Sequence, residues 1–157
     1  MTSESMGFVH LGMTVAEARK AFSEATFTRS TDGDGAALID VSLGKEVLII
    51  LYTGEEDPHA PLDEKRKIDT IETFNPICHT AEGIHPETLV FDAEKILGKT
   101  TEIVKSEIES REYISFEKQP KHMSFRLDYS GMFPDGTRST MKHSPDSKIW
   151  SIAVSIY

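Results

Sequence analysis

The sequence predicts an α+β fold: two tandem α-β-β-β units, giving about six antiparallel strands in a sheet with two helices on one face. The first observation behind this prediction is an internal repeat at an offset of 75 positions, and the second is three strand-like runs after each helix-like segment. The matching pairs are Val9 and Ile84, His10 and His85, Val15 and Val90, Ala18 and Ala93, Lys20 and Lys95, and Phe22 and Leu97. A unit that cannot bury its own apolar face needs its copy beside it. We therefore expect one domain, residues 1–157, built of repeats 7–76 and 82–157.

The two helices are predicted from their N-terminal signals and apolar spacing. Thr14 followed by Glu17 has the form of a capping box, so a helix is expected from there to about Ser23. In the second copy the helix is expected to begin at Thr88, and Gly98 is placed to form its left-handed C-terminal cap.

The strands are predicted from alternation of apolar and polar residues. Residues 123–129 alternate regularly, which is typical of a strand with one solvated face. Residues 47–52 are apolar on both faces, so we expect them to be covered on both and to lie centrally. Residues 148–157 have one apolar face, which we expect to pack on the helices. The two three-stranded sheets either join edge to edge or face each other. We favour the joined sheet because helices on one side explain one apolar face per strand.

Composition and charge narrow the classes of partner. The chain has 157 residues and a formal net charge of −9, which disfavours nucleic acid and anionic membranes and favours a basic protein partner. No apolar run approaches the roughly 20 residues of a membrane span. Residues 1–6 have no features of an export signal, so we expect a cytoplasmic protein, or a periplasmic or extracellular one if a signal peptide has been removed. The sequence leaves the oligomeric state open.

The short motifs of the sequence indicate structural roles and do not match the patterns of catalytic or metal-binding sites. Residues 32–43 begin like a calcium loop, but Leu43 occupies the place of the closing Glu. The histidines have neither one-turn helical spacing nor an alternating strand pattern, and no Gly-x-Ser-x-Gly occurs. Cys78, beside His79, is interpreted as a half-buried small apolar residue and not as an activated thiolate. We expect no cofactor, no metal site and no catalytic residues.

Two long loops, residues 53–66 and 130–147, provide the candidate binding site. Loops of this length are uncommon in a compact domain and are often functional. The proposed binding residues are Glu55, Glu56, Asp57 and His59 in the first loop, and Ser130, Gly131, Met132, Phe133 and Asp135 in the second. The acidic loop would steer a basic protein and Phe133 would anchor it. The alternative is that both loops are solvated connections; for the first, a weak cation site is also open.

Two short motifs resemble those of known inhibitor families. Residues 11–14, Leu-Gly-Met-Thr, with Glu17 and Ala18, resemble the helix start of small tandem-repeat proteins related to β-lactamase inhibitory protein and of outer-membrane assembly lipoproteins. The inhibitor resemblance implies a concave sheet that holds a partner enzyme. Residues 130–133, Ser-Gly-Met-Phe, are similar to the Ser-Gly-x-Tyr loop of bacterial lysozyme inhibitors, with Phe133 in place of Tyr.

The leading hypothesis is a non-catalytic protein-binding module, an inhibitor or assembly factor of bacterial envelope type, that uses its uncovered sheet face and the two long loops. A second hypothesis is a small hydrolase or metal-dependent enzyme that uses Asp57, His59 or His79 in a groove between the repeats. A third is a structural module without a dedicated ligand.

Overall fold

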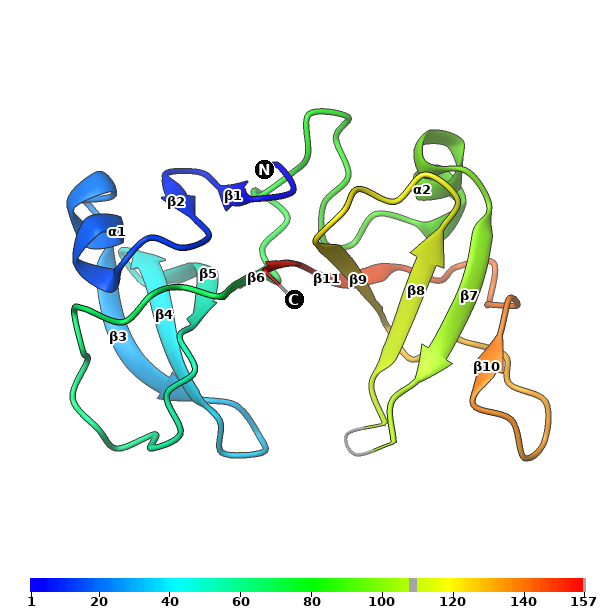
Figure 1. Cartoon of the computed structure of the whole chain (residues 1–157). Coiled ribbons are helices and arrows are strands. Elements are labelled where there is room, and N and C mark those ends of the chain that lie inside the picture. Colours follow the sequence, from blue (N-terminus) through cyan, green and yellow to red (C-terminus); the bar gives the residue numbers. More distant parts are fainter. Residues whose placement is uncertain (108–109, 157) are drawn as a thin grey trace.

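A computed structural model describes residues 1–107 and 110–156, and over these residues the chain forms two helices and eleven strands (Figure 1). The helices are α1 (Val15–Ala21) and α2 (Val90–Leu97). The strands are β1 (Ser5–Met6), β2 (Val9–His10), β3 (Thr26–Thr31), β4 (Ala37–Leu43), β5 (Glu46–Tyr52), β6 (Thr70–Thr73), β7 (Thr100–Lys105), β8 (Glu112–Phe116), β9 (Met123–Leu127), β10 (Ser139–Thr140) and β11 (Ile149–Ser155). No helix in the described ranges is long and apolar enough to span a membrane.

The predicted fold class was wrong, because the molecule is mostly β. Within the described residues there is a nine-stranded sheet and a two-stranded sheet, instead of about six strands, and the helices have only seven and eight residues. The prediction missed the strand directly after each helix, β3 and β7. In β3 the one buried residue is Phe27, and in β7 the one buried residue after the terminal Thr100 is Ile103. The alternation of buried and exposed residues that marks a half-buried strand is therefore weak in both.

The large sheet is antiparallel throughout its named pairings, with order β10-β7-β8-β9-β11-β6-β5-β4-β3. The central pair, β6 with β11, joins the first half of the chain to the second. The two halves also make matching contacts: Thr14 bridges Lys67, and Leu89 bridges Lys148. The sheet is therefore one continuous layer, with similar strand order on both sides of its centre.

The start of α1 agrees with its predicted capping box. Glu17 N donates to Thr14 Oγ1 at 3.2 Å, and Thr14 N donates to Glu17 Oε2 at 2.8 Å. The first helix ends at Ala21, slightly earlier than predicted. The second helix starts at Val90, two residues later than predicted, with Leu89 at the N-cap and no side-chain hydrogen bond there.

The core lies on the face of the large sheet that the helices cover. Val15, Ala18, Val90 and Ala93 of the helices are fully buried there. Figure 1 shows both helices in the upper part of the molecule, α1 in the first half and α2 in the second. We call the face of the large sheet that the helices leave uncovered the open face.

The open face is identified by cross-strand pairs. One row of neighbours on it runs through Asp40, Ile50, Glu72, Ala153 and Ser124. The expectation that residues 47–52 would be covered on both faces is met on one face only. Ile49 and Leu51 are buried, whereas their open-face neighbours Leu48, Ile50 and Tyr52 keep intermediate exposure.

Candidate functional site

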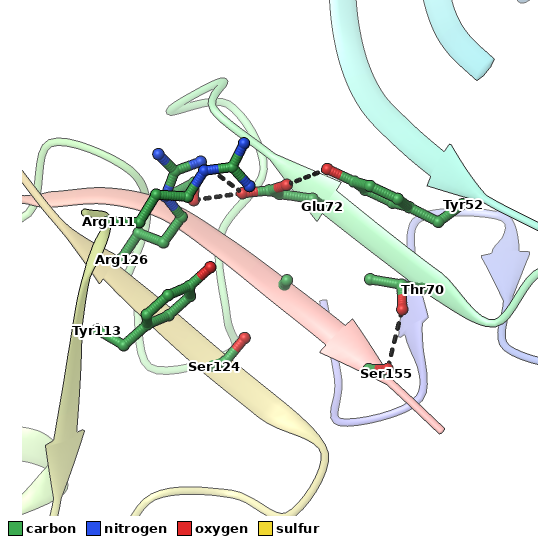
Figure 2. A pocket seen from close by; sticks show the side chains of 10 residues that line it. Tyr52, Thr70, Glu72, Arg111, Tyr113, Ser124, Arg126 and Ser155 are labelled. Atoms are coloured by element: carbon green, nitrogen blue, oxygen red, sulfur yellow. Dashed lines mark hydrogen bonds and ion pairs between the residues drawn. The ribbon is translucent and has the colours of Figure 1, made fainter. Parts of the chain in front are cut away.

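A polar cavity of about 240 Å³ lies at the centre of the open face (Figure 2). Strands β5, β6, β8, β9 and β11 supply most of its walls, and Arg111 comes from the residue before β8. Its lining is Tyr52, Thr70, Glu72, Arg111, Tyr113, Ser124, Arg126, Ser151, Ala153 and Ser155. The cavity therefore contains residues from both halves of the chain.

Glu72 is the buried centre of this cavity, with 5% of the residue exposed. Tyr52 donates its hydroxyl to Glu72 Oε2 at 2.9 Å, and Ser151 donates to Oε1 at 2.6 Å. Arg126 Nη1 lies 3.6 Å from Oε1 and completes a buried ion pair. A carboxylate removed from water needs such partners, because an unpaired buried charge costs several kcal/mol. The network fixes all four side chains in place.

Tyr52 acts in this network as a neutral hydrogen-bond donor. Burial, and then the negative charge of Glu72, raise the pKa of Tyr52 well above its usual value. The phenol therefore keeps its proton at neutral pH and holds the carboxylate of Glu72. Figure 2 shows Tyr52 on one side of Glu72 and the guanidinium groups of Arg111 and Arg126 on the other.

Arg111 links the two halves across the open face. Its Nη2 lies 3.4 Å from Asp32 Oδ2 and 3.1 Å from Asp34 Oδ2, in the turn between β3 and β4. Burial by itself would raise the pKa of Asp32. Hydrogen bonds from the backbone of Ala36 and Asp34, together with Arg111, outweigh burial and hold that pKa below its usual value. Asp32 is thus a charged partner of Arg111 at neutral pH.

A second, more apolar hollow of about 300 Å³ adjoins the cavity on the side of β4 and β5. We call it the Phe74 groove, and its lining is Asp40, Val47, Leu48, Ile50, Phe74, Asn75 and Pro76. The ring of Phe74 lies 6.4 Å from that of Trp150 in an edge-on arrangement, and the Arg126 guanidinium carbon lies 5.7 Å from the Phe74 centroid. Phe74 and Trp150 are 37% and 51% exposed. This part of the open face presents aromatic surface to solvent.

The two hollows combine hydrogen-bond groups that are held in place with apolar walls, and their described lining residues include neither His nor Cys. Over the described ranges, no group of three or more His, Cys, Asp or Glu is placed to hold a metal ion.

The first predicted binding loop packs on the helix side of the sheet. Glu55 is paired with Arg66 at 3.0 Å, while Glu56, Asp57 and His59 are exposed. Arg29 of β3 donates to the carbonyl oxygens of Ala60 and Pro61 at 3.1 and 3.2 Å, which holds the loop over the edge strand. None of these residues lines the cavity or the groove.

The second predicted loop also packs on the helix side. Gly131 N donates to Glu112 Oε2 at 2.9 Å, and a Cβ on Gly131 would come within 2.9 Å of that oxygen and 2.6 Å of the Phe133 ring. Phe133, which we predicted to be an exposed anchor, packs partly buried against the core. Ser130 donates to Asp128, and Met132 and Asp135 are exposed. The two loops lie on opposite flanks of the molecule (Figure 1), so the structure does not bring the two candidate sets together.

The linker residues behave as structural groups. Cys78 is half-buried, as predicted, and its thiol lies 3.6 Å from the Leu48 carbonyl oxygen. Burial raises the pKa of Cys78, which opposes thiolate formation. His79 Nδ1 lies 2.9 Å from the carbonyl oxygen of its neighbour Thr80.

Sequence reasoning missed the cavity, although one signal for it was present. The polar side of strand 123–129 was recognised, and Ser124 and Arg126 on that side do line the cavity. Glu72 gave a weaker signal, as the one carboxylate in the short strand Thr70–Thr73. Its partners Tyr52 and Ser151 are 20 and 79 positions away, so no local pattern connects them.

Comparison with protein-family models and with curated proteins gives no match to this chain. Among solved structures, the chain is similar to the crystal structure of the uncharacterized protein YfeY from Escherichia coli, with a TM-score of 0.64 and 13% sequence identity. The similarity covers 99% of this chain and 98% of that chain. At this identity the likeness shows the fold alone, over the whole length of both proteins.

Proposed function

We propose that this protein is a non-catalytic protein-binding module that holds its partner on the open face of the large sheet. The observation that carries the proposal is the contrast between the two faces. Helices and both long loops pack on one face, whereas the other exposes Phe74 and Trp150 beside the fixed Glu72 network.

The aromatic residues supply the expected anchors. Aromatic side chains are enriched among the few residues that dominate protein–protein binding energy. Phe74 and Trp150 already pack against each other, so a partner would meet a surface whose geometry is set. The ordering cost of binding is therefore small for these two side chains.

The polar cavity next to the aromatic residues supplies specificity. Tyr52, Ser151 and Arg126 are held by Glu72 before any partner arrives. Preorganised polar groups reject a surface that leaves them unpaired, because desolvation then has no compensation.

Charge favours a basic partner. The formal net charge of −9 would speed the approach of a basic protein at low ionic strength. An inhibitor or an assembly factor of the bacterial envelope would act through such a contact, and the similarity of residues 11–14 to inhibitor-related helix starts supports this class.

Matched contacts support the further proposal that repeats 7–76 and 82–157 arose by duplication. Val15 N donates to the Arg66 carbonyl at 3.0 Å, and Val90 N donates to the Ser147 carbonyl at 2.9 Å. The open-face site would then lie where the two copies join, at β6 and β11.

The test compares captured proteins between variants of opposite faces. Trp150→Ser and Phe74→Ser are expected to lose a partner that the unchanged protein retains. Phe91→Ser, on α2 and 58% exposed, is the control and is expected to keep that partner. A partner lost equally from all three variants, or no partner at low salt, would contradict the proposal.

A further inference from the structure

We infer that the Phe74 groove receives a cationic side chain, arginine or lysine, from a basic protein partner. The stem of this side chain would lie along Val47, Ile50 and Phe74, and its head would meet the carboxylate of Asp40. The inference rests on the proposed function and names the chemical group at the centre of the contact.

The walls of the groove suit the stem of a long basic side chain. Strand β5 is apolar on both faces, but only its helix side is covered, so Leu48 and Ile50 keep apolar surface toward the groove. Lys and Arg side chains bury their apolar stems along such surface while their heads seek polar partners.

The charge of the groove suits a cationic head. Asp40 is the charged member of the lining, and Ser30 donates to its Oδ1 at 2.6 Å, which fixes the carboxylate on β4. Glu46 lies close by, because Asn75 Nδ2 donates both to Glu46 Oε1 at 2.9 Å and to the Val47 carbonyl at 3.1 Å. A carboxylate at a partly covered site attracts a cation more strongly than one in bulk water.

The aromatic side of the groove adds a second attraction for cations. The Arg126 guanidinium already occupies one side of the Phe74 ring, at 5.7 Å from the centroid, so the attraction for a second cation comes from Trp150. Trp150 stands beside it half-exposed, and indole is the strongest of the aromatic groups in cation–π contacts.

The neighbouring cavity directs such a head to the groove. Arg111 and Arg126 both line the cavity, so a partner's cation entering there would face two guanidinium groups. In the groove the corresponding charge is the carboxylate of Asp40. The lining of the groove holds Asp40 and neither arginine, whereas a third hollow of the open face is lined by Asp40 together with Arg111 and Arg126.

Trp150 is the single tryptophan of the chain, and its ring lies 6.4 Å from that of Phe74 in the groove lining, so its fluorescence reports on the groove through Phe74. The full chain is titrated at low salt with an oligoarginine peptide, an oligolysine peptide and an oligoglutamate peptide. We expect a saturable fluorescence change with the two basic peptides and none with the acidic one. Asp40→Asn is expected to weaken binding of the basic peptides about tenfold, as loss of a charge-assisted contact predicts.

Asp92→Asn is the matched control, because it removes the same charge from exposed α2 on the other face. Equal weakening by both substitutions would mean that only net charge attracts the peptides, and it would overturn the inference. Val47→Lys gives a second measurement that is independent of Asp40. Val47 is 39% exposed, so the substitution is expected to fold, and its own cation is expected to occupy the groove and block the peptides. Undiminished peptide binding by Val47→Lys would also overturn the inference.

The capture experiment separates this inference from the proposed function. If Trp150→Ser loses the partner but Asp40→Asn and Val47→Lys retain it, the open face binds a protein without a cation in the groove, and the inference fails alone. If Trp150→Ser retains the partner, the proposed function fails, whatever the peptides do.

Discussion

The two halves of the molecule share a core face and differ on the open face. Leu51 and Leu127, 76 positions apart, are both buried in the core. At the same spacing, Ile50 of β5 corresponds to Arg126 of β9 on the open face. Packing restrains the residues of the core face, because every change of volume there is felt by neighbours. The open face carries no such restraint, so the first half could keep an apolar groove, while Arg126 of the second half pairs with Glu72 of the first in the ionic network.

The largest expected effect comes from the shared core. Leu51→Ala and Leu127→Ala are each expected to lower the free energy of unfolding by about 2–5 kcal/mol, because each removes a fully buried side chain and leaves a cavity. Urea unfolding followed by circular dichroism measures both. Since one sheet joins the halves, each variant is expected to shift a single transition. Two separate transitions would mean that the halves unfold independently.

The next effect tests the difference on the open face. Arg126→Ala is expected to cost about 3 kcal/mol, because the buried Glu72 then loses its ion-pair partner. Ile50→Ala, at the corresponding position of the first half, is expected to cost about 1 kcal/mol because that side chain is only partly buried. The same unfolding measurement compares them. If Ile50→Ala lowers the free energy of unfolding more than Arg126→Ala does, then the groove contributes more to stability than the network.

A smaller effect compares the two helix starts. Thr14→Ala removes the capping box of α1 and is expected to cost about 1 kcal/mol. The N-cap of α2 is Leu89, which makes no side-chain hydrogen bond, so Leu89→Thr is expected to gain up to about 1 kcal/mol. Thermal unfolding reads both changes. If Leu89→Thr lowers the melting temperature, the bridge of Leu89 to Lys148 constrains that position more than capping does.

The smallest effect concerns acid stability at the link between the halves. The pKa of Asp32 is lowered in the folded state, so its contribution is present above the unfolded value of about 3.9 and is lost as pH falls through the folded value. As the pH falls below about 4, the Asp32→Asn variant is therefore expected to lose less stability than the unchanged protein. Glu107→Gln, exposed at the corresponding position of the second half, is the control. Parallel pH profiles for the unchanged protein and Asp32→Asn would show that Asp32 does not contribute.

Part of this structure is local and was predictable from the sequence. Thr14 and Glu17 are one helical turn apart, so their capping box forms wherever the helix packs. The alternation of residues 123–129 fixes which side of β9 faces the core, because side chains of a strand point to opposite faces. Strands β3 and β7 gave no such signal, since the sheet partner and not their own pattern determines their conformation.

By itself, the sequence determined the start of the first helix, the buried face of β9 and the negative charge. Only the tertiary structure decided that Glu72 meets Tyr52, Arg126 and Ser151, and that Phe133 packs inward while Phe74 and Trp150 stay exposed. The physical reason is that these contacts depend on the register of strands far apart in the chain. Strand register follows from the burial of the whole sheet, not from any single segment.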